Sequence, residues 1–147
     1  MSFSYSRISA LIRLTIVTTV AASWLALALT AAPNAVAGPN HHNTDPAATG
    51  CTGDAYTIAT RQMPYRNMVV EVRYSPSCAT NWLRIQQMYG GVHFYLSSDA
   101  MGPSIVESQG GTGGTHWTKQ VYAPGATCIG FDARSVNASP SVGGRIC

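Results

Sequence analysis

The chain has 147 residues, with nine Lys and Arg against six Asp and Glu and a formal net charge of +3. This length suits one domain of ordinary size. The basic residues are scattered and only Lys119 is a lysine, so the sequence lacks the clustered Lys and Arg that a nucleic-acid-binding surface needs.

Residues 1–37 have the pattern of a secretory signal peptide. Arg7 and Arg13 form a basic start, residues 14–30 form an uncharged apolar run, and Ala35-Val36-Ala37 is an A-x-A cleavage site. Cleavage there would leave 110 of the 147 residues, with seven basic against six acidic side chains. An uncleaved membrane anchor is the alternative, because about 20 apolar residues span a bilayer. We expect cleavage, and therefore no stable membrane anchor in the secreted protein.

The segment after the cleavage site, residues 38–50, is rich in Gly, Pro, Asn and Thr, which predicts an irregular arm. His41 and His42 lie within it. Two adjacent residues of an extended chain point in different directions, and no carboxylate accompanies these histidines at a ligand-like spacing. We therefore predict neither a metal site nor a cofactor, and we expect residues 51–147 to form one secreted β domain.

Four cysteines lie beyond the cleavage site: Cys51, Cys78, Cys128 and Cys147. An even number behind a signal peptide indicates two disulfides, for which three pairings exist. We favour Cys51–Cys78 with Cys128–Cys147, because each bridge then closes the shorter loop within its own half of the chain. The paired Cys and His spacing of a zinc site is absent from the sequence.

Apolar and polar residues alternate between residues 68 and 74, which is the period of a half-buried strand. Glu71 and Arg73 fall on its polar face. The Ser-Pro-Ser sequence at residues 75–77 ends the strand with turn chemistry. An earlier segment, residues 54–60, also alternates and is predicted to be a first strand or a short helix.

Residues 82–86 and 92–96 alternate in the same way, and Gly90-Gly91 between them predicts a β-hairpin. A helix over residues 81–89 is the alternative for the first of these runs, since three of its large residues would share a helical face. The inward face of the second run is expected to consist of Val92, Phe94 and Leu96.

Short strands are also expected at residues 105–107 and 127–133, with a strand-like segment at 115–122. The Gly-rich residues 108–114 are predicted to be a flexible hairpin loop, and the tail after residue 133 a turn-rich segment tied down by Cys147. Strands at roughly ten-residue spacing with Gly and Pro turns indicate a mostly β fold. We predict a small antiparallel β-sandwich or barrel stapled by two disulfides.

Three segments resemble the YjfA-like family, a domain of unknown function in secreted and cell-surface proteins of Gram-positive bacteria. They are DPAATGC (Asp45 to Cys51), EVRYSPSC (Glu71 to Cys78) and NWLRI (Asn81 to Ile85). The family pattern runs D-P-x-x-T-G-C, then E-L-R-Y-S-x-x-C, then x-W-A-R-I. This chain departs from it mildly at Val72 and Leu83, and it has histidines where the family often has an earlier cysteine. The resemblance implies an extracytoplasmic β-rich domain and brings no reaction with it.

Histidine is the first candidate for acid–base chemistry, which here means His93 and His116. His93 is expected on the outward face of a strand, and His116 beside the Gly-rich loop. The sequence has no G-x-S-x-G, no H-E-x-x-H and no order of residues typical of a catalytic triad. Glu71 is expected to form a cross-strand ion pair rather than to belong to a catalytic pair of carboxylates. We therefore assign no catalytic residue.

Arg73, Trp82 and Arg84 are the candidate binding residues, because they belong to two strands joined by one turn. An arginine stacked on the indole would hold a sugar or an anionic wall polymer. The structural alternative makes Trp82 a core residue covered by the stems of the arginines.

The sequence thus favours a secreted or envelope-associated, non-enzymatic binding module of unknown ligand. A cell-wall glycan and another secreted protein are the partners we consider. A small secreted hydrolase using His93 or His116 is the first alternative, and a secreted inhibitor or toxin-like effector is the second.

Overall fold

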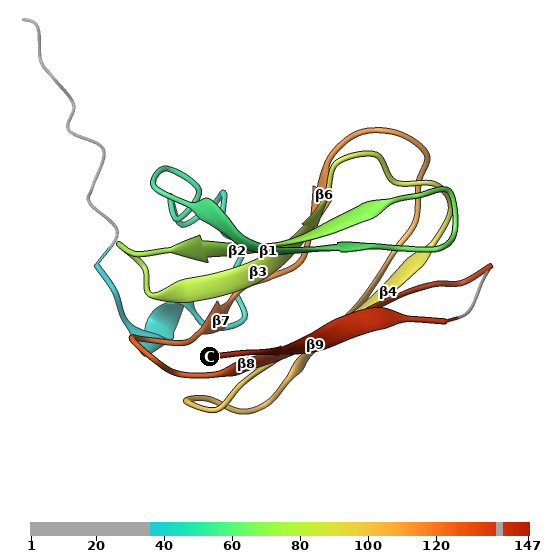
Figure 1. Cartoon of the computed structure of the whole chain (residues 1–147). Coiled ribbons are helices and arrows are strands. Elements are labelled where there is room, and N and C mark those ends of the chain that lie inside the picture. Colours follow the sequence, from blue (N-terminus) through green and yellow to red (C-terminus); the bar gives the residue numbers. More distant parts are fainter. Residues whose placement is uncertain (1–35, 138–139) are drawn as a thin grey trace, which may run out of the picture. The chain divides into compact units, whose positions relative to one another are not determined.

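The structure is a computed structural model of the chain and describes residues 36–137 and 140–147 (Figure 1). The signal peptide predicted for residues 1–37 therefore lies outside the described residues except for Val36 and Ala37. None of the helices in the described part has the length and apolar character needed to cross a membrane.

The described strands form two antiparallel sheets, which are stacked as two layers in Figure 1. The first sheet has the order β1-β2-β3-β6, and β7 also pairs with β3. Its strands are β1 (Tyr56–Gln62), β2 (Val69–Ser75), β3 (Thr80–Ile85), β6 (His116–Trp117) and β7 (Val121–Tyr122). The second sheet has the order β5-β4-β8-β9. Its strands are β4 (Val92–Ser98), β5 (Ile105–Gln109), β8 (Ile129–Ser135) and β9 (Val142–Ile146). The predicted mostly β fold is confirmed.

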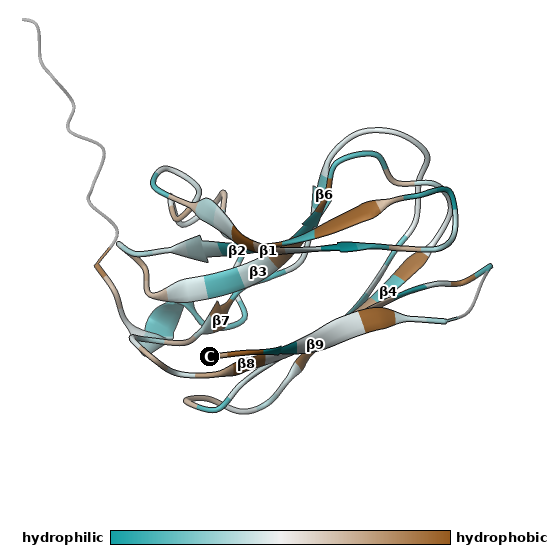
Figure 2. Ribbon diagram, viewed as in Figure 1, coloured by the Kyte–Doolittle hydropathy of each residue, from teal (hydrophilic) through white to brown (hydrophobic). Residues whose placement is uncertain are grey.

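One hydrophobic core lies between the sheets and takes the apolar face of each strand. Figure 2 shows apolar stretches on strands of both layers. The first sheet contributes Val70, Val72, Leu83 and Ile85, and the second contributes Val92, Phe94, Leu96 and Phe131. Period-two alternation explains this arrangement, because successive side chains of a strand point to opposite faces. The inward face predicted for residues 92–96 is confirmed, and β3 rules out the helical alternative for residues 81–89.

The hairpin predicted at Gly90-Gly91 is wrong. β3 and β4 flank this pair but belong to different sheets, so residues 86–91 cross from one layer to the other. Both strands carry one apolar face, and those faces pack against each other across the core instead of lying side by side. The Gly-rich loop before β6 is likewise a crossing between sheets, since β5 and β6 do not pair.

The tail also differs from the prediction, because β9 pairs with β8 along its whole length. Gly143 and Gly144 weaken the local strand signal. A Cβ at Gly143, however, would lie 2.3 Å from the carbonyl oxygen of Phe131. Glycine is therefore required there by the close approach of the two backbones, and the tail is a strand despite its composition.

Both predicted disulfides are present. Cys51–Cys78 ties the segment before β1 to the turn between β2 and β3, and Cys128–Cys147 ties the start of β8 to the end of β9. Residues 38–50 contain only the short 3-10 helix η1 (Pro39–His41) as a regular element. They are held by backbone hydrogen bonds, Asn43 N to Gln120 O at 2.8 Å and Gln120 N to Thr44 O at 3.0 Å.

Candidate binding site

The three candidate binding residues lie on the face of the first sheet that points away from the core. Arg73 and Trp82 are directly opposite each other on β2 and β3, and Arg84 follows Trp82 by two residues on the same face. Together with Thr52, Thr115 and Trp117 they line a pocket of about 120 Å³. The structure thus brings together all three residues and adds an aromatic side chain from a distant part of the chain.

Trp82 forms the floor of this pocket. Its side chain is only 2% exposed and packs with Cys51, Cys78 and Ala55 in a second, smaller apolar cluster on the outside of the sheet. The disulfide therefore covers a tryptophan that would otherwise leave a large apolar surface in water. This position gives Trp82 a structural role and leaves little of its indole for a ligand.

Arg73 fastens β2 to the segment at the start of β1. Its Nη1 donates to Thr57 Oγ1 at 2.7 Å and its Nη2 donates to the carbonyl oxygen of Ala55 at 2.5 Å. Both acceptors are neutral, and Nε is buried without a hydrogen-bond partner among residues 36–137 and 140–147. Burial and the nearby charge of Arg84 lower the pKa of Arg73, while Glu71 acts in the opposite direction.

Arg84 is held by an ion pair across the strands. Its Nε donates to Glu71 Oε2 at 2.5 Å, and the other oxygen of Glu71 accepts from Gln86 Nε2 at 3.0 Å. This is a cross-strand ion pair of Glu71, as expected, with Arg84 as its partner. Within the described part of the chain, Nε is the only atom of the Arg84 guanidinium that hydrogen-bonds, so both terminal amino groups remain available to a ligand.

Trp117 is the residue that sequence reasoning missed. It pairs with Arg84 in the β3–β6 register, and its side chain is 37% exposed. Its indole Nε1 donates to Asp45 Oδ1 at 3.4 Å, and its carbonyl oxygen accepts from Gln109 Nε2 at 2.7 Å. Trp117 also borders a second, open hollow with Asp45, Gln109 and His116. An exposed indole beside a guanidinium offers an apolar surface and a charge-assisted donor at one place.

The two candidate histidines lie on different sheets. His93 on β4 lies opposite Ser108 on β5, with His93 Nδ1 2.5 Å from Ser108 Oγ. His116 on β6 lies 3.1 Å from the carbonyl oxygen of Gly113 through Nε2. In the part of the chain that the structure describes, neither imidazole hydrogen-bonds to a carboxylate. A histidine and a serine are thus in contact, but no carboxylate of the described residues hydrogen-bonds to this histidine as the third member of a triad would.

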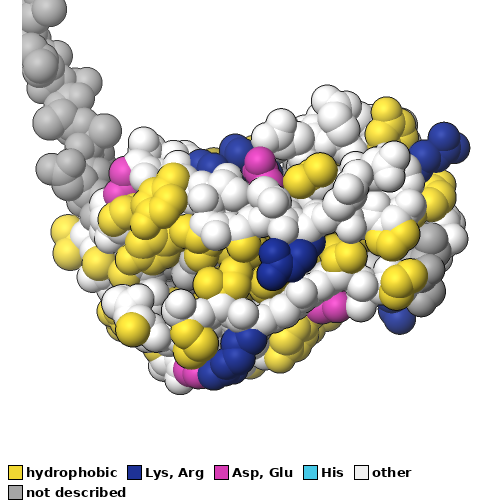
Figure 3. Space-filling view, viewed as in Figure 1, with side chains coloured by type: hydrophobic (Ala, Val, Ile, Leu, Met, Phe, Trp, Pro, Cys, Tyr) yellow, Lys and Arg dark blue, Asp and Glu magenta, His cyan; other side chains and the backbone are white. Residues whose placement is uncertain are grey.

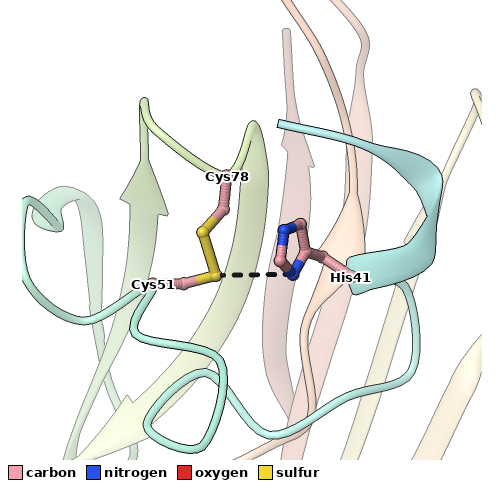
Figure 4. A group of neighbouring side chains, drawn as sticks. All are labelled: His41, Cys51 and Cys78. Atoms are coloured by element: carbon pink, nitrogen blue, oxygen red, sulfur yellow. Dashed lines mark hydrogen bonds between the residues drawn. A yellow bond between two sulfur atoms is a disulfide. The ribbon is translucent and has the colours of Figure 1, made fainter. Parts of the chain in front are cut away.

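His41 lies against the disulfide between Cys51 and Cys78 (Figure 4). Its Nδ1 is 3.9 Å from Cys51 Sγ, and one potential ligand atom from each of the three residues lies within 4.8 Å of the others. Both sulfur atoms are bonded to each other, however, and the thiolate is the form that binds a metal. The oxidised protein therefore uses this cluster to pack η1 onto the disulfide.

A further hollow lies where β1 and β9 come together. It has a volume of about 240 Å³ and is lined mainly by Tyr56, Ile58, Tyr74, Ile129 and Ile146. Figure 3 shows apolar side chains gathered on this side of the molecule. No charged side chain is among its lining residues, so it has little to orient a charged ligand, and the outer face of the first sheet is the better candidate.

A family model described as protein of unknown function (DUF2690) matches residues 40–137, a range that includes Arg73, Trp82, Arg84 and Trp117. No curated protein and no solved structure matches the chain.

Proposed function

The chain belongs to the DUF2690 family of proteins of unknown function, and we propose that it is a secreted, envelope-associated binding module without catalytic activity. The observation that carries this proposal is the pocket on the outer face of the first sheet. There the half-exposed indole of Trp117 lies opposite Arg84, whose orientation is fixed by Glu71. Ligand sites combine apolar and aromatic side chains with a small number of placed polar groups, and these groups give them specificity.

Two features support the location. Residues 1–37 have the order of a signal peptide, and two disulfides are typical of proteins that fold in an oxidising compartment. We further propose that the YjfA-like family is the relevant set of relatives, since all three resembling segments lie within the matched residues 40–137. A bacterial cell wall would then be the first surface that the secreted protein meets.

A pull-down tests the proposal. Purified cell wall and whole cells are incubated with the secreted protein and with the double variant Arg84→Gln/Trp117→Ala, which keeps both disulfides and the core. We expect the wild type to be recovered on the wall and the variant to remain in the supernatant. Equal recovery of the two proteins, or recovery of neither, would refute a wall-binding role for this pocket.

A small hydrolase is the second candidate, because His93 and Ser108 lie within hydrogen-bond reach at 2.5 Å, as a base and a nucleophile must. The test is a screen with peptidoglycan, peptide and ester substrates, with His93→Ala, Ser108→Ala and His116→Ala as variants. Turnover that is lost in His93→Ala and in Ser108→Ala would favour the hydrolase. Turnover that survives both histidine variants would exclude this version of it.

A further inference from the structure

A larger hollow lies next to the pocket beside Trp117, on the same face of the sheet. This second hollow has a volume of about 340 Å³ and includes Arg66, Val69, Glu71, Gln86 and Tyr89 in its lining. Glu71 borders the second hollow and its ion-pair partner Arg84 borders the first. The ion pair is therefore the boundary between two adjoining hollows, which we call the outer groove.

The outer groove is long enough for a chain-like ligand. Val69, Glu71 and Arg73 follow each other on one face of β2 at two-residue steps, and each step advances the strand by about 7 Å. The groove thus extends for about 14 Å along β2 from Val69 to Arg73. A single sugar would fill only part of this length.

An exposed aromatic side chain lies on each side of the ion pair. Trp117 is 37% exposed in the first hollow and Tyr89 is 40% exposed in the second. Pyranose rings present apolar C–H faces that pack on aromatic rings, and Trp and Tyr supply large apolar area together with a polar group that can stay in water. Two aromatic positions in one groove indicate two ring-binding subsites.

The groove carries an excess of positive charge. Three arginines, Arg66, Arg73 and Arg84, line it together with one carboxylate, Glu71. Arg73 donates to neutral acceptors, so no carboxylate among the residues that the structure describes pairs with it directly. Burial and the positive charge of Arg84 both lower the pKa of Arg73, and a bound anion would relieve the repulsion between the two arginines. Charge complementarity therefore points to an anionic ligand.

We propose that the outer groove binds a linear glycan whose sugars carry carboxylate groups. The proposal rests on the binding function proposed above and names its ligand class. The terminal amino groups of Arg84 bind a sugar carboxylate in the planar, two-pronged manner that guanidinium favours. Trp117 and Tyr89 pack on sugar rings on either side, and Glu71 is a positioning residue that holds Arg84 in place.

Calorimetry with defined oligosaccharides tests this. The probes are a tetramer of galacturonic acid, the same tetramer with its carboxyl groups reduced to alcohols, galacturonic acid itself, and a polymer of glycerol phosphate. We expect the acidic tetramer to bind at least about tenfold more tightly than the reduced tetramer, because a charge-assisted hydrogen bond is worth that much or more. It should also bind more tightly than the monomer, which fills a single subsite, and than the phosphate polymer, which has no sugar rings to pack on Trp117 and Tyr89.

The variants separate charge from ring packing. Arg84→Gln should remove the preference for the acidic tetramer and leave the affinity for the reduced tetramer unchanged, whereas Trp117→Ala and Tyr89→Ala should weaken both. Arg134→Gln removes an exposed arginine on β8 in the other sheet and should change neither. Circular dichroism shows whether each variant is folded. If Arg84→Gln does not fold, Trp117→Ala and Tyr89→Ala still test the groove.

The proposal is overturned if the reduced tetramer or the monomer binds as tightly as the acidic tetramer. It is also overturned if the phosphate polymer binds more tightly than the acidic tetramer. If the wild type then still binds purified wall and Arg84→Gln/Trp117→Ala does not, the proposed function stands and only its ligand class is wrong. If wall binding fails as well, the proposed function fails with it.

Discussion

Thr80 donates a hydrogen bond to Gln120 at 2.7 Å, between Oγ1 and Oε1, in a fully buried position. The Nε2 group of Gln120 in turn donates to the hydroxyl oxygens of Thr44 and Thr49, both at 2.9 Å. One buried amide thus joins β3 to the segment that precedes β1, and it leaves neither of its polar ends unpaired. These hydrogen bonds stabilise the fold, because a buried polar group without a partner lowers the free energy of unfolding.

We predict that Gln120→Leu lowers the free energy of unfolding by about 1–3 kcal/mol, since it leaves the buried hydroxyl of Thr80 without its acceptor and removes a donor from the half-buried hydroxyls of Thr44 and Thr49. Urea denaturation measures this. The matched control is Gln62→Leu at an exposed position of β1, which should change stability by about 0.5 kcal/mol or less. Equal effects of the two substitutions would show that the amide network contributes no stability.

Replacement of the two tryptophans of the candidate site should lower the free energy of unfolding by very different amounts. Trp82 is buried against the disulfide and Trp117 is half-exposed. We predict a loss of about 3–5 kcal/mol for Trp82→Ala, the usual cost of emptying an aromatic site, and about 1 kcal/mol or less for Trp117→Ala. Chemical denaturation separates them, and a large loss for Trp117→Ala would mean that it is a structural residue rather than a binding one.

The two disulfides should be reduced in order. Cys51 and Cys78 are both 0% exposed, whereas Cys147 is exposed at the end of β9. A thiolate must reach a sulfur atom to exchange with it, so we predict that Cys128–Cys147 opens first as dithiothreitol is raised. Alkylation followed by peptide mapping by mass spectrometry reports the order. Simultaneous opening of both bridges would show that the first reduction already unfolds the domain.

Removing each of the two disulfides should lower the free energy of unfolding by a different amount. Their sequence separations are 27 and 19 residues, which in the chain-entropy model correspond to about 3.5 and about 3 kcal/mol. Loss of Cys51–Cys78 additionally exposes Trp82. We therefore expect Cys51→Ala/Cys78→Ala to be the less stable of the two double variants, as measured by thermal unfolding. The reverse order would contradict the packing of Trp82 on this bridge.

The strands could be predicted from the sequence because alternation is a local pattern, and the bridges because each closes the shorter loop within its own half of the chain. Val70, Val72, Phe94 and Leu96 are placed correctly by alternation alone, since the side-chain period of a strand does not depend on its partner. The partner is a different matter. Gly90-Gly91 looks like a hairpin turn in the sequence, but the choice between a hairpin and a crossing is made by which apolar faces meet across the core, and this is a long-range property.

Part of the candidate site could also be predicted from the sequence and part could not. Arg73, Trp82 and Arg84 could be grouped in advance because one short turn joins their strands. Trp117 could not, because β6 has only two residues and its pairing with β3 brings together distant segments. The signal that was available is a tryptophan among polar neighbours after a Gly-rich loop, and this signal does not distinguish an exposed indole from a buried one.

The stability of the fold depends on pH through the carboxyl group of Asp54. Burial raises the pKa of Asp54, but the hydrogen bonds donated by Ser75 and Ser77 outweigh burial and hold this pKa below its usual value of 3.8. Ser75 Oγ donates to Oδ1 at 2.6 Å and the backbone N–H of Ser77 donates to Oδ2 at 2.7 Å. The carboxylate therefore caps the turn between β2 and β3 from the segment before β1.

The sign of the effect follows from linkage. Because the pKa of Asp54 is lower in the folded than in the unfolded chain, its contribution is complete above pH 3.8 and is lost as the pH falls through the lower, folded pKa. We predict that Asp54→Asn is less stable than the wild type by about 1 kcal/mol at pH 7, a modest figure because the group is exposed. The difference should shrink as the pH falls below 3.8, since the variant does not titrate.

Urea denaturation of both proteins between neutral and strongly acidic pH measures this. Ser75→Ala provides the control, because it removes one of the two donors and should reduce the pH-dependent part of the difference. In Asp54→Asn/Ser75→Ala the two losses should not add, since both substitutions break the same hydrogen bond. A gap between wild type and Asp54→Asn that stays constant down to acidic pH would mean that the carboxylate charge does not stabilise the turn.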